Sequence, residues 1–276
     1  MKWENYHRTR YEYASPVRDS FNDVRLQPMP IPEQTVESFL LKVLPATRLT
    51  HFRDLYSNWI NHFEIAEPHS YLLIDAQSRV ITHPPAPLPA GEKLCSFETM
   101  RAAPNIERCF DYLQSSRFVE ISADTWKLAV DATLEMDDAW QAILALMQFV
   151  HGFLAYESNS THVHTHMSEV LRDRRGVCQD FAHLLIGLCR ARKIPARYVS
   201  GYLATEAASA THAWVEVFLP GHGWRGLDPT HNCQIGETYV KIGNGRDYAD
   251  VPPISGHYRG TREHTMTVDV KITSVL

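Results

Sequence analysis

The stretch GVCQDFAHLLIGLCRARKIP, residues 176–195, predicts a buried helix that opens on a cysteine. From Cys178 onward, apolar side chains recur at the i, i+3, i+4, i+7 spacing of one helix face, at Phe181, Leu184, Leu185 and Leu188. The opposite face carries Ala182 and Ile186 and is apolar as well. The helix should end before Pro195, because proline disfavours the helical conformation in the preceding residue. A helix with two apolar faces belongs in the protein interior.

The position of Cys178 at the start of this helix suits a nucleophile. Unpaired backbone N–H groups and the positive end of the helix dipole stabilise a thiolate there. The same N–H groups can bind the oxyanion that forms when a thiolate attacks a carbonyl. Most cysteines among apolar residues only fill space. We interpret the other four in this way, namely Cys95, Cys109, Cys189 and Cys233.

A predicted hairpin supplies partners for Cys178. Residues 212–219 and 224–228 are typical of strands, and the sequence PGHG at 220–223 is typical of a turn. Pairing backwards from this turn brings His212 near Asp228, if the register is right within about three residues. An imidazole so placed can deprotonate Cys178, while the carboxylate holds the ring by its other nitrogen. Spacing alone does not establish that the helix start faces this hairpin.

Four motifs around these residues closely resemble the bacterial transglutaminase-like family. In chain order they are GVCQDFA at 176–182, IPARYVSGY at 194–202, HAW at 212–214 and DPT at 228–230. The resemblance implies that Cys178 is the nucleophile, His212 its base and Asp228 the acid that orients the histidine. It also implies a core similar to that of papain-like cysteine proteinases.

The resemblance continues outside this core. The sequences RTRY at 8–11 and RLQP at 25–28 are similar to the N-terminal region of many bacterial members, and GRDYADVPP at 245–253 resembles a block that follows the core. One departure is DLYSN at 54–58, where the family usually has glycine before the asparagine. This departure concerns the conformation of one turn.

The pattern along the chain changes from strands to helices near residue 90. Short β-type runs are expected at 8–13, 36–43, 59–65 and 71–74. The proline-rich segment 83–91 is typical of a stiff boundary. Beyond it, helices are expected at 138–153 and 167–172, and a strand at 197–203. With the family resemblance, this predicts an α+β protein: a small antiparallel β domain at 1–90, the bacterial transglutaminase-like N-terminal domain, before a papain-like (transglutaminase core) fold at 91–276 that includes the C-terminal strands.

Composition limits the partners. The formal charge of −5 arises from 32 acidic and 27 basic residues without a long run of either sign, so we expect no nucleic-acid partner. We also expect no membrane segment, because no signal peptide or apolar stretch of about 18 residues occurs. Because no signal peptide or membrane span is evident, we expect a cytoplasmic protein. Five widely spaced cysteines without a CxxC pair indicate reduced thiols and no thiolate zinc site.

Weaker signals have structural interpretations that we favour. The three alternating histidines of residues 162–166 would suit a transition metal, but no acidic or cysteine ligand accompanies them, and a polar loop beside the cleft explains them. The charged residues of 246–250 fit a turn held by Asx hydrogen bonds. Tyr156 or Gln179 are alternatives for a side-chain donor to the oxyanion, which the sequence leaves open. Trp214 and Trp224 are most simply core aromatics.

A Cys-His-Asp site forms an acyl-enzyme from an amide or ester, so the acyl acceptor defines the reaction. Water gives a peptidase or amidase, whereas an amine gives a protein-glutamine transamidase that must keep water out. We favour hydrolysis of a peptide or protein substrate without a cofactor, because neither an amine tunnel nor an acidic calcium loop is evident. A third hypothesis is a non-catalytic binding scaffold. The sequence leaves the natural substrate and the oligomeric state open.

Overall fold

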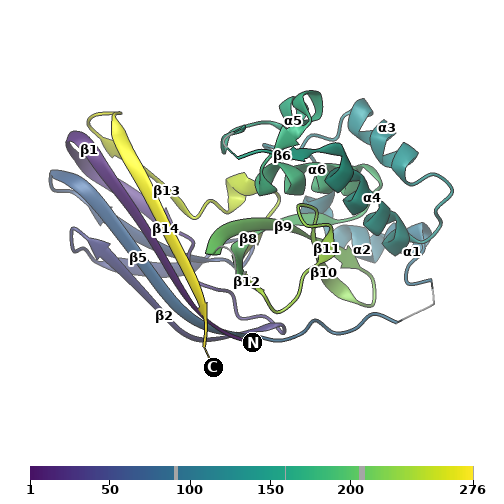
Figure 1. Cartoon of the computed structure of the whole chain (residues 1–276), viewed down its shortest axis with the longest axis horizontal. Coiled ribbons are helices and arrows are strands. Elements are labelled where there is room, and N and C mark those ends of the chain that lie inside the picture. Colours follow the sequence, from purple (N-terminus) through teal and green to yellow (C-terminus); the bar gives the residue numbers. More distant parts are fainter. Residues whose placement is uncertain (90–92, 159, 205–208, 276) are drawn as a thin grey trace.

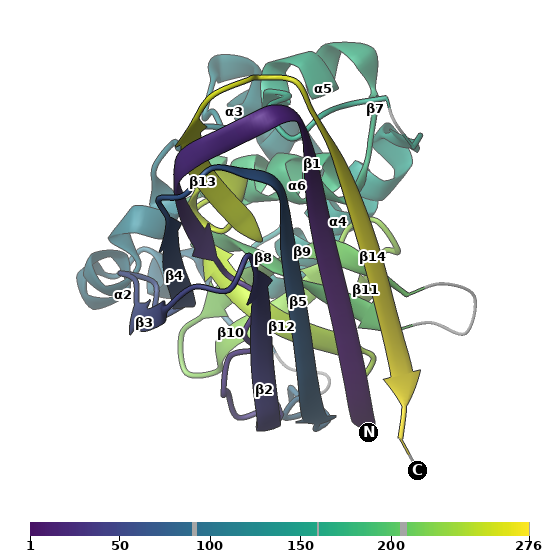
Figure 2. The same ribbon diagram turned by 90° about the vertical axis from the view of Figure 1, so that its left-hand side faces the viewer.

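The computed structural model describes residues 1–89, 93–158, 160–204 and 209–275. A curved antiparallel sheet forms one side of the molecule, and a second antiparallel sheet covered by helices forms the other (Figure 1). The chain therefore has the predicted α+β class. The two ends of the chain lie together at one end of the first sheet, where the N–H of Val275 donates to the carbonyl of Lys2 (Figure 2).

The first sheet is organised around one long strand, β1 (Lys2–Val24). Buried and exposed side chains alternate along its first half, as in a half-buried strand. This half pairs with β5 (His69–Thr82), which in turn pairs with β2 (Gln34–Leu44). The strand then bends, and its second half pairs with β4 (Trp59–Ile65), followed by β3 (Leu49–Arg53) (Figure 2). The bend folds the sheet around a small core that includes Phe63, Leu72 and Ile74.

The last two strands of the chain also belong to this first sheet. β14 (His264–Ser274) pairs with the first half of β1, and β13 (Ile254–Arg259) pairs with its second half. The sequence placed these strands with the core at 91–276. In the structure they run beside β1 instead, so the chain returns to its first domain after completing the second (Figure 1).

The second sheet has the order β11-β10-β9-β8-β12, with antiparallel neighbours. Its strands are β8 (Ala196–Ala204), β9 (Ser209–Leu219), β10 (Gly223–Asp228), β11 (Cys233–Gln234) and β12 (Tyr239–Gly245). The predicted hairpin is present as β9 and β10, with its turn at 220–222. Gly221 and Gly223 have positive φ values of 80° and 76°, which glycine adopts without steric cost.

The helix predicted at Cys178 is α6 (Cys178–Ala191), and it is the centre of the second domain (Figure 1). Every residue of α6 after Cys178 is buried. It packs on β8 and β9 and is surrounded by α3 (Ala123–Ala132), α4 (Ala139–Phe153) and α5 (Met167–Asp173). Asp138 caps α4 as predicted, by accepting from the N–H of Trp140. The sequence did not predict α3.

Short elements complete the fold. They are α1 (Phe97–Met100), α2 (Ala103–Arg108), η1 (Phe110–Leu113), β6 (Ala155–Tyr156), β7 (Arg175–Gly176) and η2 (Tyr248–Asp250). The conformation of the turn at 54–58 explains why glycine is usual before the asparagine. Ser57, at the position where glycine is usual, has a φ of 65°, and Asp54 holds the turn by accepting from the N–H groups of Tyr56 and Asn58.

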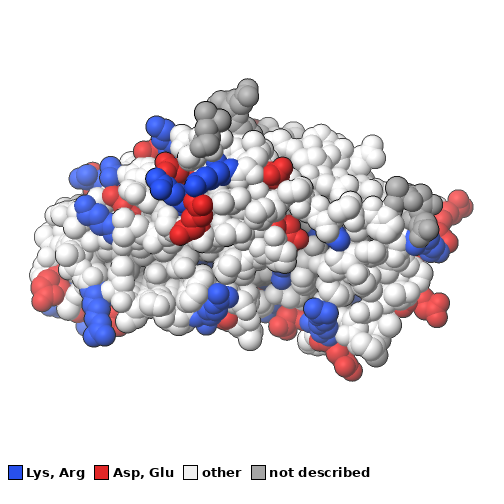
Figure 3. Space-filling model, turned by 90° about the horizontal axis from the view of Figure 1, so that it is seen from below, with Lys and Arg blue, Asp and Glu red and all other residues white. Residues whose placement is uncertain are grey.

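Acidic and basic side chains alternate over the surface rather than forming large patches of one sign on the face drawn in Figure 3. Among the described residues, no helix combines the length and apolar character needed to cross a membrane.

The far end of α6 is fixed by a buried guanidinium. Arg190 donates to the carbonyl oxygens of Tyr112, Gln114, Ala196 and Arg246 at 2.6 to 3.2 Å. Burial lowers the pKa of Arg190 to about 10. These contacts join α6, η1, β8 and the segment before η2 through one side chain.

We predict that Arg190→Met lowers the free energy of unfolding by about 3 kcal/mol or more, because several buried carbonyls lose their donor. Urea denaturation followed by circular dichroism measures this change. The matched control is Arg172→Met, since Arg172 is exposed and forms a surface ion pair with Asp173. The control should change stability by less than about 0.5 kcal/mol. Equal effects of the two substitutions would contradict this account of Arg190.

Candidate active site

Cys178 is the first residue of α6, and the entry to this helix is tightly held. Asp180 turns back so that its Oδ2 accepts from the N–H of Val177 at 2.8 Å and from the hydroxyl of Thr161 at 2.6 Å. A Cβ at Gly176 would lie 2.6 Å from the Asp180 side chain, so only glycine fits there. These contacts set the direction in which the chain enters the helix and thereby place Cys178.

The thiol of Cys178 differs from the other four in its surroundings. Cys178 is half-buried at a helix start, whereas Cys95, Cys109 and Cys189 are fully buried. Burial raises the pKa of these three thiols, to about 12 for Cys189, and also raises the pKa of half-buried Cys233. The structure therefore agrees with the interpretation of these four as packing residues. All five cysteines are free thiols.

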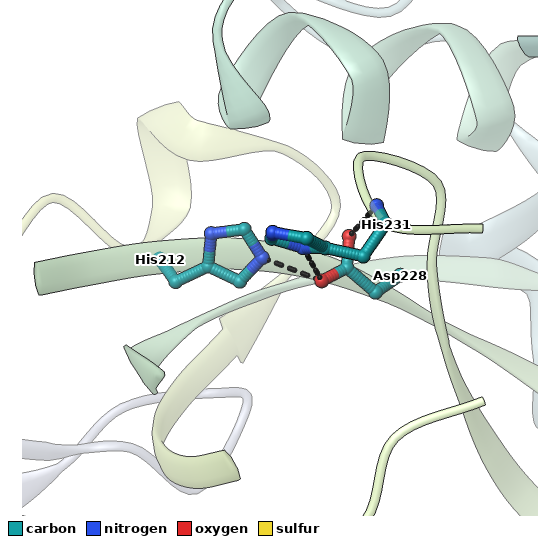
Figure 4. A group of neighbouring side chains, drawn as sticks. All are labelled: His212, Asp228 and His231. Atoms are coloured by element: carbon teal, nitrogen blue, oxygen red, sulfur yellow. Dashed lines mark hydrogen bonds and ion pairs between the residues drawn. The ribbon is translucent and has the colours of Figure 1, made fainter. Parts of the chain in front are cut away.

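His212 lies between Asp228 and Cys178. Its Nε2 donates to Asp228 Oδ2 at 2.7 Å, and its second ring nitrogen points away from the carboxylate (Figure 4). Burial lowers the pKa of His212, but hydrogen bonds to Asp228 and Cys178 outweigh burial and raise the pKa to about 9. The arrangement thus favours an imidazolium beside the Cys178 sulfur. The helix start and the hairpin, which spacing alone could not join, meet at this ring.

Asp228 ends β10 and is completely buried. Its Oδ2 accepts from His212, from His231 Nδ1 at 2.8 Å and from the Tyr239 hydroxyl at 2.8 Å. Its Oδ1 accepts from the N–H groups of Thr230 and His231 at 2.8 and 3.2 Å. Burial raises the pKa of Asp228, but the hydrogen bonds from His212, His231 and Tyr239 hold it well below its usual value. Asp228 is therefore a fixed, charged acceptor.

Sequence reasoning missed His231 and Tyr239. His231 comes from the loop after β10 (Figure 4), and its side chain is 51% exposed. Tyr239 is the first residue of β12. The position of His231, three residues after Asp228, was a signal that could have indicated the contact. His212, Asp228 and His231 place three possible metal-ligand atoms within 4.8 Å of one another. Both imidazoles form hydrogen bonds to Asp228.

The structure also places the two alternatives for an oxyanion donor. β6 pairs with β7, so that Tyr156 lies opposite Gly176, two residues before Cys178. Burial and then Cys178 raise the pKa of Tyr156, which is nevertheless 58% exposed. Gln179 instead uses its amide nitrogen to donate to the carbonyl of Val163 at 3.2 Å. Of the two side chains, Tyr156 is thus the one that faces solvent beside the thiol.

The two hairpin tryptophans are packed. Trp214 is completely buried, and its ring lies almost parallel to that of His212, with 6.4 Å between the centroids. A Cβ at Gly201 would lie 2.4 Å from the Trp214 ring, so glycine makes room for this indole. Trp224 lies under the Arg197 guanidinium at 4.0 Å. Trp214 therefore packs against one face of the His212 ring.

The polar motifs at 162–166 and 246–250 form contacts with residues close to them in the sequence. In the 162–166 loop, His162 and His164 have ring centroids 6.3 Å apart, and the N–H of His166 donates to Glu169 at the start of α5. In the 246–250 turn, Arg246 pairs with Asp250, and Asp247 accepts from the N–H of Ala249. The turn interpretation of residues 246–250 is confirmed.

A thiol at the start of a buried helix, facing a histidine and an aspartate on an adjacent antiparallel sheet, defines the class of papain-like folds. Residues 127–229 match the family model of the transglutaminase-like superfamily, and residues 6–81 match that of the bacterial transglutaminase-like N-terminal region. The chain belongs to the transglutaminase-like superfamily and carries the bacterial N-terminal region of that family.

Several known proteins are similar over different parts of the chain. An uncharacterized protein of Mycobacterium leprae is 33% identical over 97% of this chain and 96% of its own length. A protein-glutamine gamma-glutamyltransferase of Pseudomonas aeruginosa is 33% identical over 102 residues, which are 32% of this chain and 15% of that enzyme. A solved structure from Cytophaga hutchinsonii, described as a candidate cysteine protease, has a TM-score of 0.80 and 24% identity. That likeness covers 100% of this chain and 91% of the other, and it shows the shared fold.

We predict that the raised pKa of His212 makes stability depend on pH. Since the folded pKa is about 9 and the ordinary value is 6.5, this group's contribution is full below pH 6.5 and is lost as pH rises through about 9. Wild type should lose up to about 3 kcal/mol more over this range than His212→Gln. Urea denaturation at a series of pH values measures the difference.

The control for this experiment is His51→Gln, on the exposed strand β3. It should keep the pH dependence of the wild type. If wild type and His212→Gln have the same pH dependence, the imidazolium is not stabilised by the fold.

Proposed function

We propose that this protein is a thiol-dependent acyl-transfer enzyme that hydrolyses a peptide or amide bond of a peptide or protein substrate. The observation that carries the proposal is the position of His212, which is hydrogen-bonded both to the buried Asp228 and to Cys178. Family membership supports enzyme chemistry of the cysteine protease or transglutaminase type. The three proposed catalytic residues are Cys178, His212 and Asp228.

In the first half of the reaction, His212 takes the proton of the Cys178 thiol, and the sulfur attacks the substrate carbonyl carbon. The carbonyl oxygen becomes an oxyanion beside the first turn of α6, whose N–H groups point toward it. The tetrahedral intermediate collapses when the C–N bond breaks, and the leaving amine takes the proton from His212. The product of this half is a thioester on Cys178 together with a free amine.

In the second half, His212 removes a proton from water, and the hydroxide adds to the thioester carbonyl. The C–S bond breaks, the acid product leaves, and the proton returns to sulfur from His212. Asp228 keeps its charge throughout and holds the ring by Nε2, so that the other nitrogen stays directed at the thiol. The five donors on Asp228 support this role.

Access of water to the site favours hydrolysis over transamidation. Tyr156 and His231, which lie beside Cys178 and Asp228 respectively, are each more than half exposed. A transamidase needs the thioester to be shielded from water until an amine arrives. The open surroundings therefore suit water as the acyl acceptor.

Protein-glutamine transamidation is the second candidate. Its support is the similarity of 102 residues to the gamma-glutamyltransferase of P. aeruginosa. A non-catalytic scaffold has less support, because a scaffold would not need a buried carboxylate with five donors directed at a histidine. We also propose that the protein acts in the cytoplasm, where its free thiols would stay reduced.

The test is incubation of the protein with a library of glutamine-containing peptides, with and without a primary amine, followed by mass spectrometry. We predict products that have gained water, by cleavage or by deamidation, whether or not amine is present. Cys178→Ala should abolish these products. Cys109→Ala, which removes a buried thiol outside the proposed triad, should retain them.

Two results would change the proposed function. Amine adducts without hydrolysis products would identify a transferase. Equal product formation by wild type and Cys178→Ala would rule out the thiol mechanism.

A further inference from the structure

A group of aromatic side chains outside the proposed triad lines a cleft between the two domains. The cleft has a volume of about 550 Å³, and each of the two domains forms one of its walls. The N-terminal domain contributes β1, β13 and β14, with Tyr11, Tyr13, Tyr258 and His264. The catalytic domain contributes Phe118, His164 and Tyr248. We call this space the interdomain cleft.

The N-terminal wall is a connected group of rings. The Tyr13 and Tyr258 rings are 4.9 Å apart with their edges and faces in contact, and Tyr258 shares a hydrogen bond of 3.2 Å with His264. This wall exists because β13 and β14 return to β1, since Tyr258 and His264 lie on those strands. Met266, 56% exposed, continues the wall outward as an uncovered apolar side chain.

The catalytic wall is built on the start of α6. Val163, which lines the cleft, accepts from the side-chain amide of Gln179, the residue after Cys178. Phe118 stacks on His183, one turn further along α6, at 5.7 Å between ring centroids. The N–H of Tyr248 donates to the same His183. The cleft wall is therefore connected by a hydrogen bond to the residue that follows Cys178.

The charge of the cleft is one-sided. Its described lining includes the cation of Arg117 but no aspartate or glutamate. The Arg117 guanidinium lies over the Phe118 ring, and no carboxylate among the described residues pairs with it. An unpaired cation beside aromatic rings suits a carboxylate that neighbours an apolar or aromatic side chain.

We propose that the interdomain cleft is the substrate subsite of the Cys178 enzyme and that it takes an acidic peptide segment with an aromatic side chain. This inference rests on the proposed function, because it assigns the substrate class of the same site. In this arrangement Arg117 binds the substrate carboxylate, and the half-buried rings of Tyr11, Tyr248 and Tyr258 hold the aromatic side chain. The N-terminal domain then acts in substrate recognition.

The test measures binding without turnover, using Cys178→Ala in the full chain and fluorescein-labelled peptides. Three peptides carry Phe-Glu, Phe-Lys or Ala-Glu on both sides of a central glutamine. Fluorescence anisotropy should show that the Phe-Glu peptide binds about tenfold more tightly than either of the others. Adding Arg117→Gln should remove the preference for glutamate over lysine while the preference for phenylalanine over alanine remains.

The matched control is Arg172→Gln in the same background, because Arg172 is an exposed arginine on α5 outside the cleft. It should bind all three peptides as the parent does, and circular dichroism checks that each variant is folded. Equal dissociation constants for the three peptides, or a loss on Arg117→Gln that is the same for all of them, would overturn the proposed subsite.

Failure of the proposed function and failure of the proposed subsite give different experimental results. If the Phe-Glu peptide binds with the expected preference but the wild-type enzyme does not convert it, the subsite stands and the hydrolase proposal fails. If the wild type hydrolyses all three peptides with equal kcat/KM, the hydrolase proposal stands and the subsite fails.

Discussion

The buried carboxylate of Asp228 is the constraint around which the site is arranged. A charged group that is buried from solvent destabilises the folded state unless hydrogen bonds surround it. The buried Asp228 carboxylate accepts hydrogen bonds from five donors. Two of the donors are the backbone groups of the loop after β10, and one is a hydroxyl from β12. The carboxylate thus ties β9, β10 and β12 together at the point where the histidine must be fixed. The raised pKa of His212 follows from this placement.

A second set of contacts fixes helix α6, which places Cys178 next to His212. Gly176 and Asp180 fix the start of α6, and Arg190 fixes its end by joining four backbone segments. Between them the helix is buried along its whole length against β8 and β9. The thiol is therefore carried by a rigid element, and rigidity of this kind is what a reacting pair of groups requires. The first sheet adds the other wall of the interdomain cleft.

The sequence predicted those parts of the structure that local patterns determine. The period of α6 and the PGHG turn are local, so the helix, the hairpin and the approach of His212 to Asp228 could be expected. The family motifs then predicted that the start of this helix, with Cys178, faces the hairpin that carries His212 and Asp228. Whether Cys178, His212 and Asp228 act as a catalytic triad stays a prediction that experiment must test.

Features that depend on distant segments were out of reach. Nothing local indicates that β13 and β14 pair with β1, more than 200 residues away in the chain, or that Tyr239 donates to Asp228 across the sheet. The long β1 was expected only as a short run at 8–13, and the alternation of buried and exposed side chains is interrupted directly after it, at residues 14–16. The glycine-like conformation of Ser57 became clear only from its φ, although the family pattern pointed to that turn.

The central claim is that Asp228 holds His212 as a charged partner for the Cys178 thiolate. Its most direct test is the rate of iodoacetamide alkylation at Cys178 between pH 5 and 9, located by mass spectrometry of the labelled peptide, in wild type and Asp228→Asn. The account predicts that wild-type Cys178 reacts faster than a free model thiol near neutral pH, and that Asp228→Asn loses most of this advantage. A wild-type rate no greater than that of the model thiol, or one unchanged by Asp228→Asn, would contradict it.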